Sequence, residues 1–265
     1  MLRSVALVAV LLSVAGEAAA QGQPVRFPSV AVGSAAAGPE ITGWLARPPG
    51  DGPFPAVILA HSCAGMSRHT EFWGRLLTGW GYVVVAPDSF GPRGEKNVCG
   101  RGGVVSSSMR APDIAGALDF LKAQPFVTPG RIGLIGHSHG GGAAVRAVQA
   151  SYGLAARGLK AAVAYYPTCS EQFDRDVALP LLILIGDKDD WTPAERCRRL
   201  QAAGFSQPDL VEAVYYPDAR HSFDSKLPER TVTVASGRTY RLAYDPVAGP
   251  DAEARTKAFF AKFLK

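Results

Sequence analysis

The chain has 265 residues, of which 47% are hydrophobic and 19% charged, and its formal net charge is +5. This composition excludes a disordered or collagen-like chain and predicts a packed core. The basic residues are interleaved with acidic ones and form no recognised nucleic-acid motif, so the charge indicates a solvated basic surface and no nucleic-acid partner.

Residues 1–20 have the pattern of a secretory signal peptide. Arg3 supplies a positive charge, an apolar run follows at residues 5–15, and three alanines precede the expected cleavage site after residue 20. A membrane anchor is the alternative, but the run is shorter than the ~20 residues that span a bilayer. We therefore expect a periplasmic or secreted chain, residues 21–265, that forms a single domain without a membrane span.

Further along the chain, short apolar runs alternate with longer amphipathic stretches, the pattern of parallel strands joined by helices. Buried strands are expected at residues 56–60, 82–86, 132–135, 160–166, 181–185 and 211–216. Helices are expected at residues 69–78, 112–123, 139–152, 193–203 and 251–264. Two early strands, 25–32 and 41–47, predict an antiparallel edge, and a hairpin is expected near Gly237. The predicted class is an α/β fold with a mostly parallel, doubly wound sheet and flanking helices.

A serine lies where the strand at 132–135 meets the helix at 139–152. Residues 136–140 read Gly-His-Ser-His-Gly, the Gly-x-Ser-x-Gly pattern of a nucleophile elbow between a strand and a helix. A glycine-rich turn or a phosphate-binding turn is the alternative. Neither explains the acidic and histidine residues that follow, so Ser138 is the candidate nucleophile.

A serine hydroxyl needs a base, and the base needs a carboxylate that orients it. In this fold the acid follows the serine in the chain and the histidine follows the acid. The loop after the strand at 181–185 carries Asp187, Asp189 and Asp190, and the loop after the next strand carries His221. His221 is the last histidine of the chain and the predicted base, while three carboxylates remain candidates for the acid.

The elbow, the Gly-x-x-Asp-x-x-x-Pro loop at 186–193 and the His-Ser-Phe at 221–223 resemble the dienelactone hydrolase family of α/β-hydrolases. The resemblance extends from about residue 56 to the C-terminus and implies the α/β-hydrolase fold. It also implies that Asp189 is the acid. The expected oxyanion hole combines the backbone N–H of His139, which follows the nucleophile, with the N–H that the resemblance places at Cys63.

The sequence departs from the family at three places. Ser138 stands where the family has a cysteine, and Ser62 stands where it has a glutamate. The arginine that grips the substrate carboxylate in the family would fall near Asp224 or Ser225. The resemblance therefore implies the hydrolytic mechanism but not the dienelactone substrate.

Three residues are candidate substrate contacts: Arg93 near the expected mouth of the site, Trp191 two residues after the acid, and His61 in the oxyanion loop. His137 and His139 converge with His61, but no carboxylate completes a recognisable ligand set, so we expect no metal. No cofactor is expected either.

Four cysteines in an exported chain permit two disulfides in three connectivities. We predict the pairs Cys63–Cys99 and Cys169–Cys197, because each pair lies just past neighbouring predicted strands. A disulfide at Cys63 would stiffen the oxyanion loop.

These observations predict an exported, cofactor-free serine hydrolase that cleaves a small-molecule ester or lactone through an acyl intermediate on Ser138. Two alternatives remain at this point. A peptidase that resembles the catalytic domain of prolyl oligopeptidase would share the elbow and the chain order, and a binding protein without activity could have the same fold. The sequence does not predict the oligomeric state.

Overall fold

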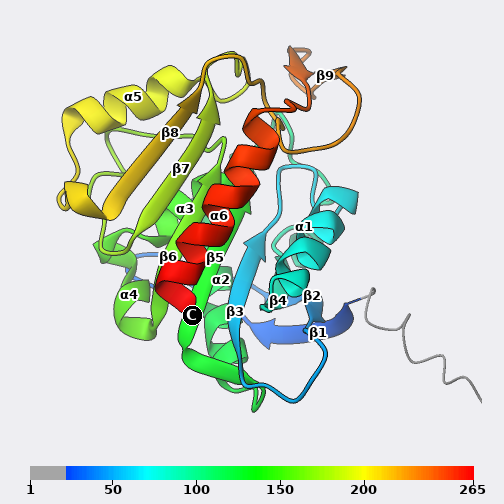
Figure 1. The fold of residues 1–265 in the computed structure, drawn as a ribbon, viewed down its shortest axis with the longest axis vertical. Coiled ribbons are helices and arrows are strands. Elements are labelled where there is room, and N and C mark those ends of the chain that lie inside the picture. The colour runs from blue at the N-terminus through cyan, green and yellow to red at the C-terminus, as the bar shows by residue number, and fades with distance from the viewer. Residues whose placement is uncertain (1–21) are drawn as a thin grey trace, which may run out of the picture.

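The structure is a computed structural model that describes residues 22–265, so the predicted signal peptide lies outside the described residues. An eight-stranded sheet in the order β1-β2-β4-β3-β5-β6-β7-β8 forms the centre of the fold. Helices cover both faces of this sheet: α1 and α6 lie in front of it in Figure 1, and α2 and α3 lie behind it. This architecture is the predicted α/β fold.

The strands of the main sheet are β1 (Gln23–Pro28), β2 (Glu40–Ala46), β3 (Phe54–Ala60), β4 (Val83–Asp88), β5 (Val127–His137), β6 (Leu159–Tyr165), β7 (Leu181–Gly186) and β8 (Val211–Tyr216). The helices are α1 (Arg68–Gly79), α2 (Ala111–Lys122), α3 (His139–Ala147), α4 (Leu154–Arg157), α5 (Ala194–Ala203) and α6 (Ala248–Leu264). A separate hairpin joins β9 (Arg230–Thr233) to β10 (Thr239–Leu242).

Strands β3 to β8 run parallel, while β2 pairs antiparallel with both β1 and β4. The inner strands lie between two layers of helices, so both of their faces are buried, and this explains why they appear in the sequence as unbroken apolar runs. Residues 56–60 of β3, for example, are fully buried. The predicted antiparallel edge and the hairpin near Gly237 are both present.

The helix predicted over residues 139–152 is shorter in the structure, where α3 ends at Ala147. The backbone of Gln149 is extended and forms an isolated antiparallel bridge with Val177. This contact with a segment distant in the sequence competes with the local helical pattern, which continues for several residues in the sequence.

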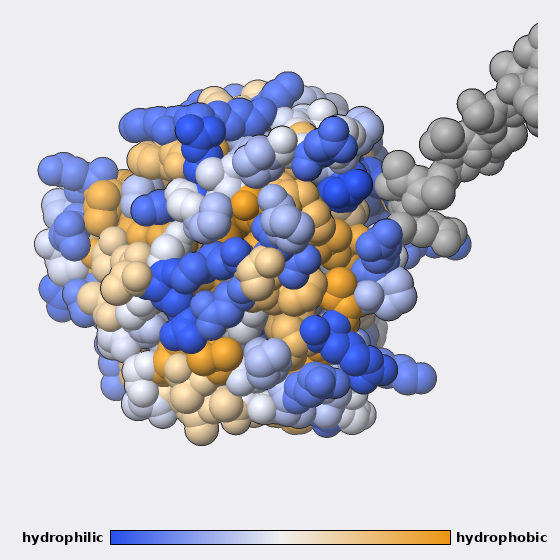
Figure 2. All heavy atoms as spheres, turned by 90° about the horizontal axis from the view of Figure 1, so that it is seen from below, coloured by the Kyte–Doolittle hydropathy of each residue, from blue (hydrophilic) through white to orange (hydrophobic). Residues whose placement is uncertain are grey.

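Two disulfides connect loops to the core, and they have the predicted pairing. Cys63–Cys99 joins the loop after β3 to the segment between β4 and α2, and Cys169–Cys197 joins the segment after β6 to α5. No helix in the described part of the chain is long and apolar enough to cross a membrane. On the face seen in Figure 2, hydrophilic residues are interspersed with apolar ones.

Candidate active site

Ser138 occupies a strained turn between β5 and α3. Its backbone has φ 55° and ψ −113°, a conformation that residues with a side chain rarely adopt. A Cβ atom at Gly136 would lie 2.0 Å from the carbonyl oxygen of Gly140, and one at Gly140 would lie 2.1 Å from that of Ala60. Both glycines of the elbow pattern are therefore required by close backbone contacts, and these contacts hold the serine at the end of β5.

The Ser138 hydroxyl lies next to an imidazole and a carboxylate. His221 Nε2 is 3.0 Å from Ser138 Oγ, and His221 Nδ1 is 2.7 Å from Asp189 Oδ2. The three side chains are buried and follow β5, β7 and β8, whose carboxyl ends meet at one edge of the sheet. With the Nδ1 proton donated to Asp189, Nε2 is free to accept the serine proton.

The Asp189 carboxylate is held by its own loop. Its Oδ1 accepts the backbone N–H groups of Trp191 and Thr192, each at 2.8 Å. The Thr192 hydroxyl lies 2.9 Å from the other carboxylate oxygen and 3.0 Å from the carbonyl oxygen of Tyr166. These contacts fix the orientation of the carboxylate toward His221.

The other two carboxylates of this loop point elsewhere. Asp187 forms an ion pair with Arg198 on α5. Asp190 is exposed and reaches the backbone N–H of Arg241 at 3.3 Å. Asp189 is thus the carboxylate that contacts the imidazole.

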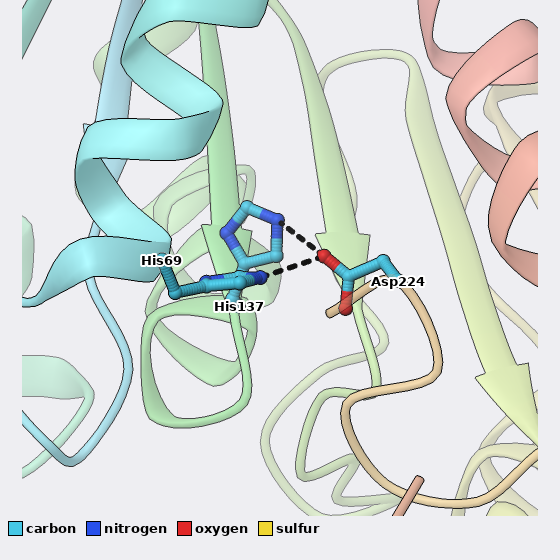
Figure 3. A group of neighbouring side chains, drawn as sticks. All are labelled: His69, His137 and Asp224. Carbon is cyan, nitrogen blue, oxygen red and sulfur yellow. Dashed lines mark hydrogen bonds and ion pairs between the residues drawn. The ribbon is translucent and has the colours of Figure 1, made fainter. Parts of the chain in front are cut away.

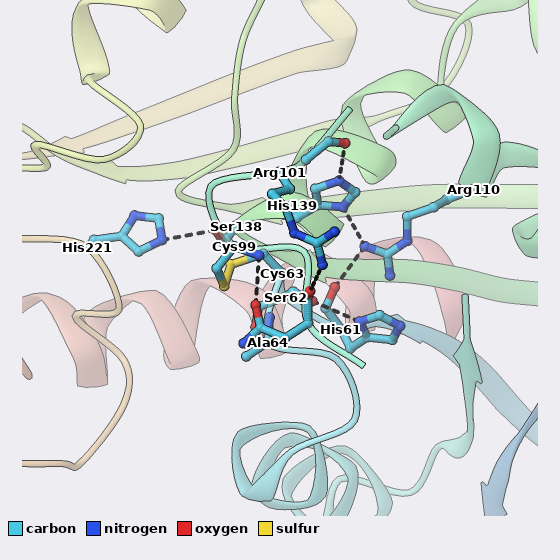
Figure 4. The surroundings of a disulfide bond; sticks show 12 residues. His61, Ser62, Cys63, Ala64, Cys99, Arg101, Arg110, Ser138, His139 and His221 are labelled. Atoms are coloured by element: carbon cyan, nitrogen blue, oxygen red, sulfur yellow. Dashed lines mark hydrogen bonds between the residues drawn. A yellow bond between two sulfur atoms is a disulfide. The ribbon is translucent and has the colours of Figure 1, made fainter. Parts of the chain in front are cut away.

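Among the backbone N–H groups of the described residues near Ser138, those of Cys63, after β3, and His139, at the start of α3, donate no hydrogen bond. Free N–H groups beside a nucleophile are the donors that an oxyanion requires. Cys63, Cys99 and Ser138 line the same cavity, and Figure 4 shows the disulfide beside the serine.

Arg110, which sequence reasoning missed, connects the two loops that carry these N–H groups. Its Nη1 donates to the carbonyl oxygen of His61 at 2.9 Å and lies 3.0 Å from His139 Nδ1 (Figure 4). The guanidinium is buried, and this burial lowers the Arg110 pKa to about 10. No motif marks this arginine, because its partners lie 49 and 29 residues away in the chain.

A cavity of about 570 Å³ opens above Ser138 and His221. Trp191 lines it, stacks on Tyr240 with ring centroids 4.7 Å apart, and lies 5.0 Å from the His221 ring. Other lining side chains come from α1, from the disulfide loop, from the segment between β8 and β9, and from the β9–β10 hairpin: Arg68, Arg101, Leu227, Arg230, Val232, Val234 and Leu242. No carboxylate is among the lining residues.

Arg93 and His61, the two further candidate substrate contacts, do not line this cavity. The two terminal nitrogens of the Arg93 guanidinium, Nη1 and Nη2, are each 2.9 Å from the buried carboxylate of Asp113, so its charge is used inside the fold. The His61 ring lies 2.8 Å from the carbonyl oxygen of Ser62 and accepts the N–H of Ser89 at 3.2 Å. Burial and the charge of nearby Arg110 lower the His61 pKa well below its usual value, so the ring is neutral.

The buried carboxylate of Asp224 also escaped prediction. It accepts hydrogen bonds from the Trp73 indole at 2.7 Å and the Tyr166 hydroxyl at 2.8 Å, and its Oδ2 is 2.8 Å from His69 Nε2. The His69 ring, from the start of α1, reaches the interior and packs against His137. Of the three histidines expected to converge, His61 and His139 both lie beside Arg110, whereas His137 packs against His69.

Comparison with known proteins identifies relatives of this chain. A protein of Escherichia coli K12 named "Putative carboxymethylenebutenolidase" is 25% identical over 245 residues, which cover 85% of this chain and 84% of that protein. Dipeptidyl-peptidase 5 of Porphyromonas gingivalis is 31% identical over 119 residues, 39% of this chain and 16% of that protein. The crystal structure of a dienelactone hydrolase from Anabaena variabilis superposes with a TM-score of 0.64 at 20% identity, over 92% of this chain and all of that one.

The family model of dienelactone hydrolases matches residues 41–264, which is nearly the whole described chain. That match begins in β2 and ends in α6, so it includes every loop that surrounds Ser138. The chain therefore belongs to the dienelactone hydrolase family and has its α/β-hydrolase fold.

Proposed function

We propose that this protein is an exported serine hydrolase that cleaves a carboxylic ester or lactone through an acyl intermediate on Ser138. The proposal rests on one observation above all. The buried contacts Ser138 Oγ to His221 Nε2, at 3.0 Å, and His221 Nδ1 to Asp189 Oδ2, at 2.7 Å, lie at the floor of a cavity of about 570 Å³.

In the proposed reaction, His221 takes the proton of Ser138 as the serine oxygen attacks the carbonyl carbon. The negative charge on the carbonyl oxygen is stabilised by the N–H groups of Cys63 and His139. His221 then gives the proton to the departing alkoxide, and the acyl group remains on Ser138. A water molecule, deprotonated by His221, attacks the acyl group and releases the acid.

The substrate class follows from the family and from the cavity. The family supports an ester or lactone, and the Escherichia coli relative is named for the hydrolysis of a butenolide. Ser225 and Asp224, which stand near the family's carboxylate-binding arginine, carry no positive charge, and Asp224 is fully buried. We therefore propose a different substrate from that of the family's namesake members.

A fluorophosphonate probe tests the proposal directly. Such a probe should label Ser138 of the folded protein, and Ser138→Ala should abolish labelling together with the hydrolysis of p-nitrophenyl esters. Asp190→Asn is the matched control, because it changes an exposed carboxylate one residue from Asp189 and should leave labelling intact. Absence of labelling in the folded protein would favour the binding protein without activity.

A peptidase activity is the second candidate, because Dipeptidyl-peptidase 5 shares a 31% identical segment with this chain. The same serine chemistry would then act on an amide. A panel of short esters, long esters, lactones and peptide amides separates the two. Cleavage of amides alone would overturn the esterase proposal and support the peptidase.

Export to the periplasm or the extracellular space is proposed from two features. Residues 1–20 have the pattern of a signal peptide, and two disulfides form among the four cysteines. Disulfides persist in oxidising compartments. Fractionation of cells that express the full chain should recover a protein that begins near Gln21 outside the cytoplasm.

A further inference from the structure

A group of three side chains lies beside Ser138 and His221, and the proposed reaction does not use it. The group contains His69 on α1, His137 at the end of β5, and Asp224 in the loop after His221 (Figure 3). Asp224 Oδ2 is 2.8 Å from His69 Nε2 and 3.7 Å from His137 Nε2. All three ligand atoms lie within 4.8 Å of one another.

The His137 ring nitrogen points to a missing ligand. Its Nε2 atom is buried and has no hydrogen-bond partner, although buried polar atoms are normally satisfied. The group thus includes a potential metal ligand, His137 Nε2, which has no partner and faces a carboxylate.

The Asp224 carboxylate supplies the matching charge. Its Oδ2 lies 2.8 Å from His69 Nε2, and this contact with a hydrogen-bond donor favours the ionised carboxylate. Hydrogen bonds from Trp73 and Tyr166 fix its orientation. Metal-binding carboxylates typically have such outer hydrogen bonds.

We propose that His69, His137 and Asp224 form a binding site for one zinc ion. Two imidazole nitrogens and one carboxylate oxygen are ligands that zinc prefers, and a fourth position then remains for water. Ligands at about 2.1 Å from a tetrahedral zinc lie about 3.4 Å from one another, and the observed 2.8 and 3.7 Å bracket that separation. Zinc would replace the proton on His69 Nε2, and that proton would be released to solvent.

The position of the site shows how an ion would reach it and which segments the ion would connect. His69 lines the cavity above Ser138, so an ion can enter there, whereas the other two ligands are fully buried. His137 directly precedes Ser138, and Asp224 follows His221 by three residues. A bound ion would therefore fasten α1 to the two segments that carry the nucleophile and the base.

Zinc titration of the chelator-treated, disulfide-intact protein tests the site by isothermal calorimetry. We expect one equivalent per chain and a Tm that rises with zinc concentration. His69→Gln keeps an N–H donor for Asp224 but lacks the imidazole, so it should fold and bind zinc at least about tenfold more weakly. His221→Gln is the matched control, because it removes the neighbouring histidine–carboxylate pair and should leave zinc affinity unchanged.

Cobalt(II) provides a second readout, because its visible absorption reports imidazole coordination in a four-coordinate site. The absorption should appear in the wild-type chain and in His221→Gln, and should be lost in His69→Gln. Equal affinity in His69→Gln, binding of less than one equivalent, or an equal Tm rise with magnesium would overturn the proposal. Loss of binding in His221→Gln alone would assign the ion to the Asp189–His221 pair and also overturn it.

Discussion

Removing each of the two disulfides in turn allows an effect on stability to be distinguished from an effect on catalysis. They enclose similar lengths of chain, with sequence separations of 36 for Cys63–Cys99 and 28 for Cys169–Cys197. In the chain-entropy treatment, each cross-link contributes about 4 kcal/mol to the free energy of unfolding at 25 °C. Replacing either pair by serines should therefore lower Tm by a similar amount, roughly 8 to 16 °C for a chain of this size.

The effect on turnover should differ between the pairs. Cys63 carries a proposed oxyanion N–H, and loss of one such donor costs about 10²- to 10³-fold in kcat. The hydrogen bond from the Val98 N–H to the Cys63 carbonyl, at 2.9 Å, still restrains the loop after the disulfide is removed. We therefore expect Cys63→Ser/Cys99→Ser to lower kcat by only about tenfold.

The other pair is the control, since neither Cys169 nor Cys197 lines the cavity. Cys169→Ser/Cys197→Ser should keep kcat within about twofold of the wild type, since it removes no oxyanion donor. Ester hydrolysis is measured at saturating substrate, at a temperature where thermal melts show all variants folded. Full kcat in the Cys63→Ser/Cys99→Ser variant, or equal losses in both variants, would refute the reasoning.

Three further predictions concern single residues. Asp189→Asn should lower kcat by about 10⁴-fold, because the amide favours the wrong His221 tautomer. Asp190→Asn should change kcat less than twofold. The reverse order in ester turnover would mean that Asp190 is the acid. Arg110→Met should lower kcat about tenfold with little change in KM, because the oxyanion loops lose their bridge, and Arg110→Lys should recover part of it. Unchanged kcat in Arg110→Met would remove the arginine from the mechanism. The lowered pKa of His61 means that the unfolded chain binds a proton below pH ~6.5 that the native chain does not, so this group's contribution to stability is lost as pH falls. In urea unfolding between pH 6 and 4.5, His61→Gln should reduce the slope of unfolding free energy against pH by about 1.4 kcal/mol per unit, and an unchanged slope would contradict the assignment.

Local patterns predicted the scaffold well. Strands buried on both faces appear as apolar runs, so β3 to β7 were recognisable in the sequence. Ser138 was recognisable because close backbone contacts require glycine on both sides of it. Chain order and the family resemblance then indicated His221 and Asp189, which the structure places in contact.

Side-chain partners from distant loops were not predictable in this way. Arg93 was expected to face the substrate, but it pairs with Asp113 on α2, and no sequence spacing connects the two. Arg110 and Asp224 were overlooked for the same reason, because their partners are scattered over several elements. The role of a buried charge depends on the residues that the fold places beside it, and local sequence patterns do not show which residues these are.

The elbow has an implication for how this family diversifies. The unusual torsion angles at residue 138 are imposed by Gly136 and Gly140 and by a hydrogen bond from the residue 138 N–H to the Tyr165 carbonyl, none of which involves the hydroxyl. Sulfur and oxygen could therefore be exchanged at the tip of one side chain while the scaffold stays the same. Such interchangeability would let descendants of one ancestral enzyme alter their reactive atom in a single mutational step.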